Sequence, residues 1–151
     1  MIKIVSGNIL DAKEDLICHQ VNCYGVMGSG VAKAIREKWP EVYRNYKGYC
    51  YDHGPAYLMG TCLLVPINNG NQAVMNMFAQ NSYGRDDRRY TSYDSFYNCL
   101  EFINETVSRH CSIAFPYGIG CGLGGGNWSI IYAMIEDVLG DKDVVIYKLE
   151  D

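Results

Sequence analysis

The sequence lacks the features that mark several large functional classes. None of its 151 residues belongs to an apolar run approaching the roughly 20 residues that cross a bilayer. The start, MIKIVSGNIL, is typical of a strand and has no basic-then-apolar leader. We therefore expect a soluble, unprocessed, cytoplasmic protein with no membrane partner. Basic residues are also few, because 13 Lys and Arg stand against 17 Asp and Glu. The net charge of -4 argues against nonspecific nucleic-acid binding, which needs cations to neutralise phosphates.

No Cys-x-x-Cys pair occurs among the seven cysteines. The segments CHQVNC and CYDH contain candidate ligands, but a structural zinc site usually has two paired spacings. We therefore predict no metal and no cofactor. Several cysteines lie inside apolar, strand-like runs, where a thiol acts as a small hydrophobic group. An odd number of such residues indicates free thiols in a reducing compartment.

The chain fits a single domain over residues 1–151, with 48% hydrophobic residues and no linker or internal repeat. Apolar patterns alternate between strands and helices. The turn NNGN predicts a tight hairpin between the strands at 61–67 and 72–79, because Asn and Gly accept positive φ values. Strands are expected at 2–6, 16–22, 61–67, 72–79, 112–117 and 143–149, and helices around 31–39, 41–49, 93–110 and 128–139. This order predicts an α/β sandwich around a mixed sheet.

The segment GIGCGLGGGNW, residues 118–128, follows a buried strand and precedes an amphipathic helix. Six of its first nine residues are glycine, which lets a ligand approach the backbone closely. Backbone N–H groups converge at such a junction, at the positive end of the helix dipole. The segment therefore predicts a phosphate-binding loop.

A second segment, NCYGVMGSGVAKAI at residues 22–35, has the same strand, glycine and helix order, with Gly25, Gly28 and Gly30. In open α/β sheets, ligands bind beyond the carboxyl ends of the strands. Two such loops on one rim can flank a single crevice and hold a diphosphate.

Three familiar glycine or phosphate motifs fit poorly. The pattern Gly120-x-Gly122-x-x-Gly125 resembles a dinucleotide fingerprint, but too little chain follows it. In GVMGSGVAK, Val31 occupies the position of the P-loop lysine. A cysteine phosphatase needs arginine six residues after its nucleophile, whereas Asn127 follows Cys121 at that distance.

Together, SGNIL, HQVNCYGVMGSGVA and FPYGIGCGLGGGNW resemble the macro domain family along essentially the whole chain. The resemblance implies a three-layer α/β/α sandwich around a mixed, mostly parallel sheet. It also implies a crevice for ADP-ribose, a product of NAD metabolism, between the two loops. Asn8 and Ile9 would lie beside the adenine, although the family commonly has aspartate in place of Asn8, and Tyr147 would pack on it or act as an ordinary strand aromatic. The remaining implied contacts are Asn22, Gly28, Ser29, Gly30, Val31, Tyr83, Gly118, Ile119, Gly120, Cys121, Gly122, Leu123 and Gly124.

Within the family, ICHQVNCYGVMGSGVA is most similar to the branch of ADP-ribose 1''-phosphate phosphatases and terminal-ADP-ribose glycohydrolases. His19 and Asn22 match catalytic residues of that branch. The glycohydrolase lysine and aspartate are replaced by Asn81 and, approximately, Gly124. The resemblance therefore favours a hydrolase, most simply an ADP-ribose 1''-phosphate phosphatase with His19 as acid or base.

Three alternatives stay open: a non-catalytic reader of ADP-ribose, a protein that sequesters an NAD-derived signal, and a hydrolase of ADP-ribosylated macromolecules. The loop GRDDRRY bears on this choice. Arg85, Arg88 and Arg89 form either a solvated loop or a lid over a substrate phosphate, with Tyr83 and Gly84 as its hinge and wall.

Overall fold

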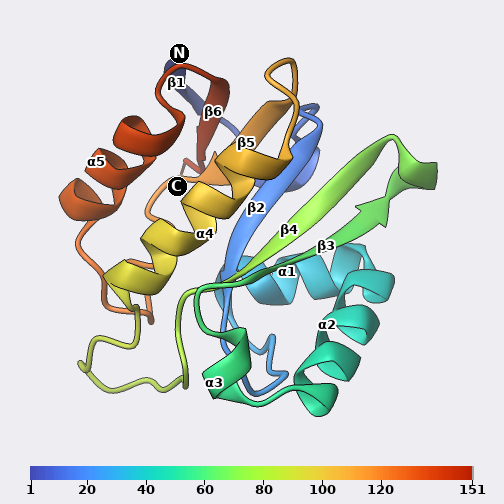
Figure 1. Cartoon of the computed structure of the whole chain (residues 1–151), viewed down its shortest axis with the longest axis vertical. Helices are drawn as coiled ribbons and strands as arrows, with labels where there is room; N and C mark the ends of the chain where they lie inside the picture. The colour runs from blue at the N-terminus through green and yellow to red at the C-terminus, as the bar shows by residue number, and fades with distance from the viewer. Residues whose placement is uncertain (151) are drawn as a thin grey trace.

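The computed structural model describes residues 1–150 and is organised around one six-stranded sheet (Figure 1). The strand order is β1-β6-β5-β2-β4-β3. Every neighbouring pair is parallel except β3 and β4, which are antiparallel. The mixed, mostly parallel sheet predicted from the sequence is therefore confirmed. The strands are β1 (Ile2–Ser6), β2 (Leu16–Val21), β3 (Cys62–Ile67), β4 (Gln72–Phe78), β5 (Ser112–Pro116) and β6 (Asp143–Lys148).

Helices cover both faces of the sheet, which gives the three-layer sandwich (Figure 1). One face carries α4 (Tyr93–Thr106) and α5 (Trp128–Leu139), and the other carries α1 (Gly30–Lys38), α2 (Pro40–Asp52) and the short α3 (Pro55–Leu58). Because both faces are buried, the central strands are nearly continuous apolar runs. No helix within residues 1–150 combines the length and the apolar character needed to cross a membrane.

Strand alternation divides β2 between the two cores. Leu16 and Cys18 pack with α4 and α5, whereas Ile17 and Val21 pack with α1 and α2. The period of two therefore places His19 on the α1 and α2 side. Gln20, one residue later, faces the opposite core.

The connections differ from the sequence prediction in three places. The helix expected at 93–110 ends at Thr106, because Val107 adopts extended backbone and packs against the α4 and α5 core. Two short elements were not predicted: α3 and a 3-10 turn at Ile9–Asp11. The NNGN hairpin is confirmed, with positive φ at residues 68–70.

Two neighbouring isoleucines on α5 allow a test of this packing. Ile131 is fully buried in the α4 and α5 core, whereas Ile130 is 43% exposed. Ile131→Ala should lower the free energy of unfolding by about 2–5 kcal/mol, since it removes apolar contacts and leaves a cavity. Ile130→Ala is the matched control and should cost less than about 1 kcal/mol. Urea unfolding of both variants measures the difference, and equal losses would contradict the assigned orientation of α5.

Candidate functional site

A cavity of about 720 Å³ lies at the carboxyl end of β2. Its wall draws residues from four segments: 19–22, 26–32, 80–85 and 116–124. We call residues 22–30 the first glycine loop, residues 118–126 the second glycine loop and residues 80–91 the lid segment. Both glycine loops thus border one cavity, beyond the strand ends where α/β sheets bind ligands. Residues 1–150 contain no group of three or more His, Cys, Asp or Glu side chains arranged to hold a metal ion.

The second glycine loop presents a set of unpaired backbone amides. Within residues 1–150, five N–H groups of this loop have no hydrogen-bond acceptor, and all five residues line the cavity: Gly118, Gly120, Gly122, Leu123 and Gly124. The amide of Cys121 instead donates to the Gly118 carbonyl at 2.8 Å, and Cys121 does not line the cavity. Unpaired amides ahead of the N-terminus of α5 are suited to an anion.

Close approach explains why this loop needs glycine. Gly120 has a φ of +76°, and a Cβ there would lie 2.8 Å from the Gln20 Oε1. A Cβ on Gly124 would lie 2.7 Å from the Gly120 carbonyl oxygen. Gly122 is different, because a Cβ there meets nothing within 4 Å. A side chain at Gly122 would therefore leave the loop intact and occupy open space.

The first glycine loop is built around Asn22. Its Oδ1 accepts hydrogen bonds from the Tyr24 amide and the Tyr46 hydroxyl, both at 2.9 Å, while its Nδ2 donates to the Val26 carbonyl at 2.8 Å. Asn22 lines the cavity, but its side chain is committed to holding the loop. The loop then leads into α1, and Gly28, Ser29, Gly30 and Val31 line the cavity around that helix N-terminus.

His19 lines the same cavity and is only 1% exposed. Its Nε2 lies 2.6 Å from the Asn76 Oδ1, and the Asn76 Nδ2 donates to the Leu63 carbonyl at 3.0 Å. The Leu63 carbonyl can only accept, so it fixes the Asn76 amide with Oδ1 toward His19. The imidazole proton is therefore on Nε2. Nδ1 carries the lone pair and has no partner within residues 1–150.

Burial lowers the pKa of His19 from 6.5 to about 4, and the hydrogen bond to Asn76 offsets only part of this effect. The ring is consequently neutral at pH 7, with Nδ1 as a hydrogen-bond acceptor. This state suits a general base, whereas a general acid must already carry the proton.

The three lid arginines have different environments. Arg85 lines the cavity together with Tyr83 and Gly84. Arg88 pairs with Asp86 at 3.0 Å, and the Arg89 guanidinium lies 4.4 Å from the ring centre of Tyr93. Arg85 is thus the one arginine of this group at the cavity.

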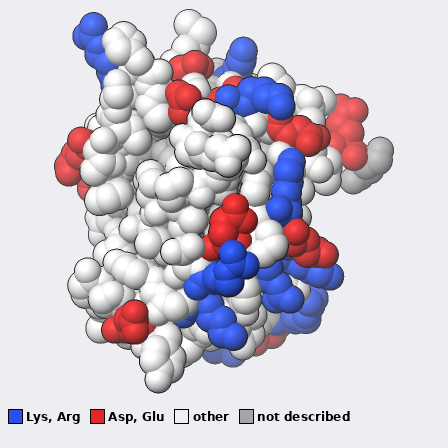
Figure 2. All heavy atoms as spheres, turned by 90° about the vertical axis from the view of Figure 1, so that its right-hand side faces the viewer, with Lys and Arg blue, Asp and Glu red and all other residues white. Residues whose placement is uncertain are grey.

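Positive charge gathers on the helices that follow the first glycine loop. Figure 2 views the side of β3 and α2, where Lys and Arg side chains cluster in the lower part of the face. The Lys47 side chain packs against Gly25, with its Cγ 3.5 Å from where a Cβ would lie. None of the Lys and Arg side chains on α1 and α2 lines the cavity, and Glu37, Glu41 and Asp52 lie on the same two helices. The exposed cations of α1 and α2 are Lys33, Arg36, Lys38, Arg44 and Lys47.

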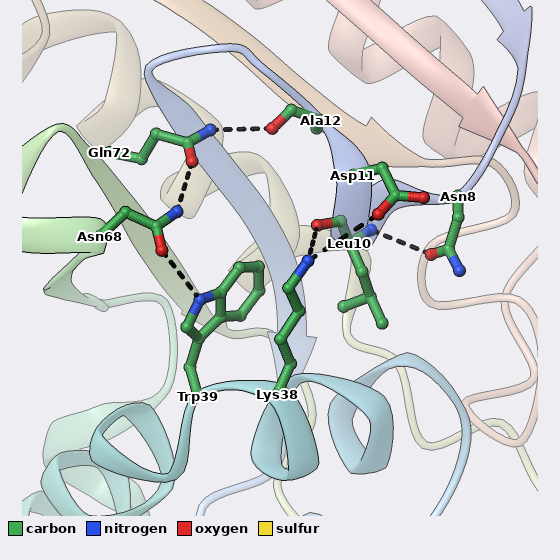
Figure 3. A network of polar contacts seen from close by, with 8 residues as sticks. All are labelled: Asn8, Leu10, Asp11, Ala12, Lys38, Trp39, Asn68 and Gln72. Carbon is green, nitrogen blue, oxygen red and sulfur yellow. Dashed lines mark hydrogen bonds and ion pairs between the residues drawn. The ribbon is translucent and has the colours of Figure 1, made fainter.

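The expected adenine contacts lie outside the cavity wall. The Asn8 Oδ1 accepts a hydrogen bond from the Leu10 amide at 2.9 Å, so that this side chain caps the 3-10 turn (Figure 3). Lys38 donates to the Leu10 carbonyl at 2.6 Å and thereby ties the same turn to α1. Ile9 is 6% exposed and packs in the core. The Tyr147 hydroxyl donates to Glu14 at 2.5 Å, and burial followed by this bond raises the pKa of Tyr147 to about 12.

Four polar residues at or behind the cavity were absent from the sequence interpretation: Gln20, Asn76, Gln80 and Thr91. The available signal for Asn76 was its polarity within the apolar run VMNMFA, whereas Thr91 lies in a polar segment and gives no such signal. A buried polar group is costly unless it is hydrogen-bonded, so such an interruption indicates a specific partner. The partner itself comes from another strand or loop, and local sequence does not identify it.

Comparison with known proteins identifies the family. The family model described as Macro domain matches residues 18–135, which is most of the chain. The chain belongs to the macro domain family. Its relatives include the ADP-ribose 1''-phosphate phosphatase of Saccharomyces cerevisiae, 25% identical over 98% of each chain. The corresponding Scheffersomyces stipitis phosphatase is 35% identical over 44% of this chain and 43% of its own length. The DNA ADP-ribosyl glycohydrolase of Mycobacterium tuberculosis is 28% identical over 97% of this chain.

The matches span less than half the length of the last two relatives, 43% and 42% respectively. Solved macro domains share the fold. The macrodomain of Mycobacterium tuberculosis DarG superimposes with a TM-score of 0.82 at 24% identity and covers 97% of each chain. Thermosipho africanus DarTG, solved in complex with ADP-ribose, has a TM-score of 0.80 at 22% identity over 97% of this chain and 41% of its own.

The lowered pKa of His19 predicts a pH-dependent stability. Between pH 6.5 and about 4 the unfolded chain binds a proton at His19 that the folded chain does not. The free energy of unfolding should therefore rise with pH through this window and fall as the pH drops. His19→Gln keeps an amide donor but does not titrate. Its loss of stability between pH 7 and pH 4.5, measured by urea unfolding, should be about 2 kcal/mol smaller than that of the wild type. The same loss in both proteins would contradict a neutral His19.

Proposed function

We propose that this macro domain binds ADP-ribose through its diphosphate. The observation that carries the proposal is the set of five unpaired amides of the second glycine loop, in residues that line a cavity whose wall also includes the N-terminus of α1. Backbone amides and a helix dipole bind phosphate oxygens without a charged side chain. The cavity of about 720 Å³ is within the usual size of small-molecule sites. The names of the yeast relatives and of the DarTG complex with ADP-ribose support this choice of ligand.

Gly122 offers the sharpest test of binding. Gly122→Val places a branched side chain in open space beside the amides, so it should reduce ADP-ribose affinity at least about 100-fold through steric exclusion while the protein stays folded. Gly48→Ala is the matched control, because Gly48 also has nothing within 4 Å of a Cβ but lies on α2, away from the cavity wall. Titration calorimetry measures both affinities. Unchanged affinity in Gly122→Val would remove the second glycine loop from the site.

We further propose that the bound derivative is hydrolysed, with ADP-ribose 1''-phosphate as the first candidate substrate. The His19 Nδ1 lone pair takes a proton from water, and the water oxygen attacks phosphorus. The bond from phosphorus to the 1''-oxygen then breaks, and that oxygen leaves with the proton that His19 received. The Arg85 guanidinium, from the lid segment, faces the developing negative charge.

Cleavage through a lysine adduct has little support. Asn81 occupies the position where the glycohydrolase pattern has lysine, and its backbone carbonyl accepts from the Cys23 amide at 3.0 Å. The second glycine loop contains no carboxylate. Release of ADP-ribose from DNA or from protein would therefore need a different mechanism from the lysine route.

A non-catalytic reader is the second candidate. The observation in its favour is that the polar side chains of His19 and Asn22 already have structural partners: Asn76 for His19, and the first glycine loop for Asn22. A reader needs only the amides and the shape of the cavity. The two functions make different demands on His19.

Phosphate release separates the two candidates. If His19 is the base, His19→Ala should lower turnover of ADP-ribose 1''-phosphate by about 10²–10⁴ while ADP-ribose affinity changes little, because base catalysis typically supplies this factor. A coupled assay for inorganic phosphate measures turnover. Equal turnover in both proteins would remove His19 from the reaction. Binding without phosphate release by the wild type would support the reader.

A further inference from the structure

Thr91 is a buried hydroxyl at the junction of the lid segment and the second glycine loop. It is 2% exposed and does not line the cavity. Its Oγ1 donates to the Gly120 carbonyl at 2.7 Å and accepts from the Gln20 Nε2 at 2.8 Å. One side chain therefore joins β2, the lid segment and the second glycine loop.

The direction of each hydrogen bond in this network is determined. The Gln80 Nε2 donates to the Ser82 carbonyl at 2.8 Å, which leaves the Gln80 Oε1 as an acceptor. The Gln20 Nε2 donates to this oxygen, also at 2.8 Å, and to Thr91. The Thr91 proton is then free for the Gly120 carbonyl. No alternative amide orientation satisfies the same set of partners.

The network holds the loop carbonyls on the side of Thr91. The Gly120 carbonyl accepts from Thr91 and from the Gly126 amide at 2.8 Å. The Gly124 carbonyl accepts from the Tyr90 and Thr91 amides, at 2.8 and 2.9 Å. A carbonyl turned into the cavity would repel a phosphate, so holding these two carbonyls away from it keeps the site favourable for an anion.

Glycine makes this contact possible. A Cβ on Gly124 would lie 2.6 Å from the Thr91 Oγ1, and a Cβ on Gly120 would lie 3.3 Å from the same atom. Some glycines of the second glycine loop are therefore needed because Thr91 packs against them, and not because a ligand does. The phosphate side of the loop and its Thr91 side impose separate requirements.

We propose that Thr91 is a positioning residue that fixes the second glycine loop in its anion-binding orientation before ligand arrives. The inference rests on the proposed ADP-ribose site and deepens it, because it assigns the orientation of the amides to a side chain that does not contact the ligand. A ligand that uses those amides should depend on the Thr91 hydroxyl. A ligand without phosphate should not.

The test compares Thr91→Val, which keeps the shape of the side chain, with Thr91→Ser, which keeps the hydroxyl. Thr91→Val should weaken ADP-ribose binding about tenfold, the effect of one net hydrogen bond, whereas Thr91→Ser should stay within about twofold of the wild type. Adenosine, which has no phosphate, should bind all three proteins equally. Calorimetry gives the first affinities, and chemical-shift titration gives those for adenosine. Circular dichroism melting shows whether each variant folds, and Thr91→Ala replaces Thr91→Val if the valine is not accommodated.

Three results would overturn the inference: an unchanged ADP-ribose affinity in Thr91→Val, a loss in Thr91→Ser equal to that in Thr91→Val, or an equal loss for adenosine. Amide hydrogen exchange without ligand gives an independent measurement. The Gly126 amide, bonded to the Gly120 carbonyl, should exchange about tenfold faster in Thr91→Val than in Thr91→Ser. If the wild type failed to bind ADP-ribose, the proposed function would fail, while the exchange rates would still decide the role of Thr91.

Discussion

Unpaired backbone amides are the feature on which this site depends. None of the five residues that carry them is buried, so their amides are open to solvent and can exchange water for an anion, provided that the backbone is held in place. Here glycines permit the path, and buried side chains fix it: Asn22 in the first glycine loop and Thr91 in the second. The Gly120 and Gly124 carbonyls accept hydrogen bonds from residues behind the loop, which fixes the backbone while the five amides stay without a protein acceptor. The binding surface is therefore made by main chain, and its shape is set by side chains that lie behind it.

The same strands that build the core also set the chemistry. His19 on β2 and Asn76 on β4 are register neighbours in the sheet, and both lie on the face that packs against α1 and α2. Apolar surroundings keep the imidazole neutral, and the Leu63 carbonyl on β3 determines which nitrogen has the proton. Three adjacent strands, β2, β4 and β3, thus determine the protonation state of His19. Such a buried network is stable only when its polar groups find partners, and Nδ1 is the one ring nitrogen of His19 without a partner within residues 1–150.

The sequence predicted the parts of the fold that rest on local periodicity. The helix from Trp128 to Leu139 has the predicted bounds, and the NNGN hairpin forms as Asn and Gly require. The end of α4 was misplaced because Val107 leaves the helix to join a core formed by distant residues. Glycine spacing indicated the two loops. It did not indicate which amides form hydrogen bonds within the loops, as the Cys121 amide does with the Gly118 carbonyl. Partners such as Gln20 and Thr91, 71 residues apart, follow from the fold and not from any local pattern.

The lid segment is hydrogen-bonded to the two glycine loops at its ends, and the side-chain hydrogen bonds at its tip are formed within the segment itself. Cys23 and Thr91 hold its two ends to the first and second glycine loops, while Asp86 forms hydrogen bonds with Arg88 and Tyr90 inside the tip. Because the tip contributes little to the cores, its length and composition can drift in evolution at small cost to folding. Arg85 projects from this tolerant stretch to the cavity. Substitutions within residues 83–89 would therefore alter the cavity wall around Arg85 while the backbone of the second glycine loop stays as it is.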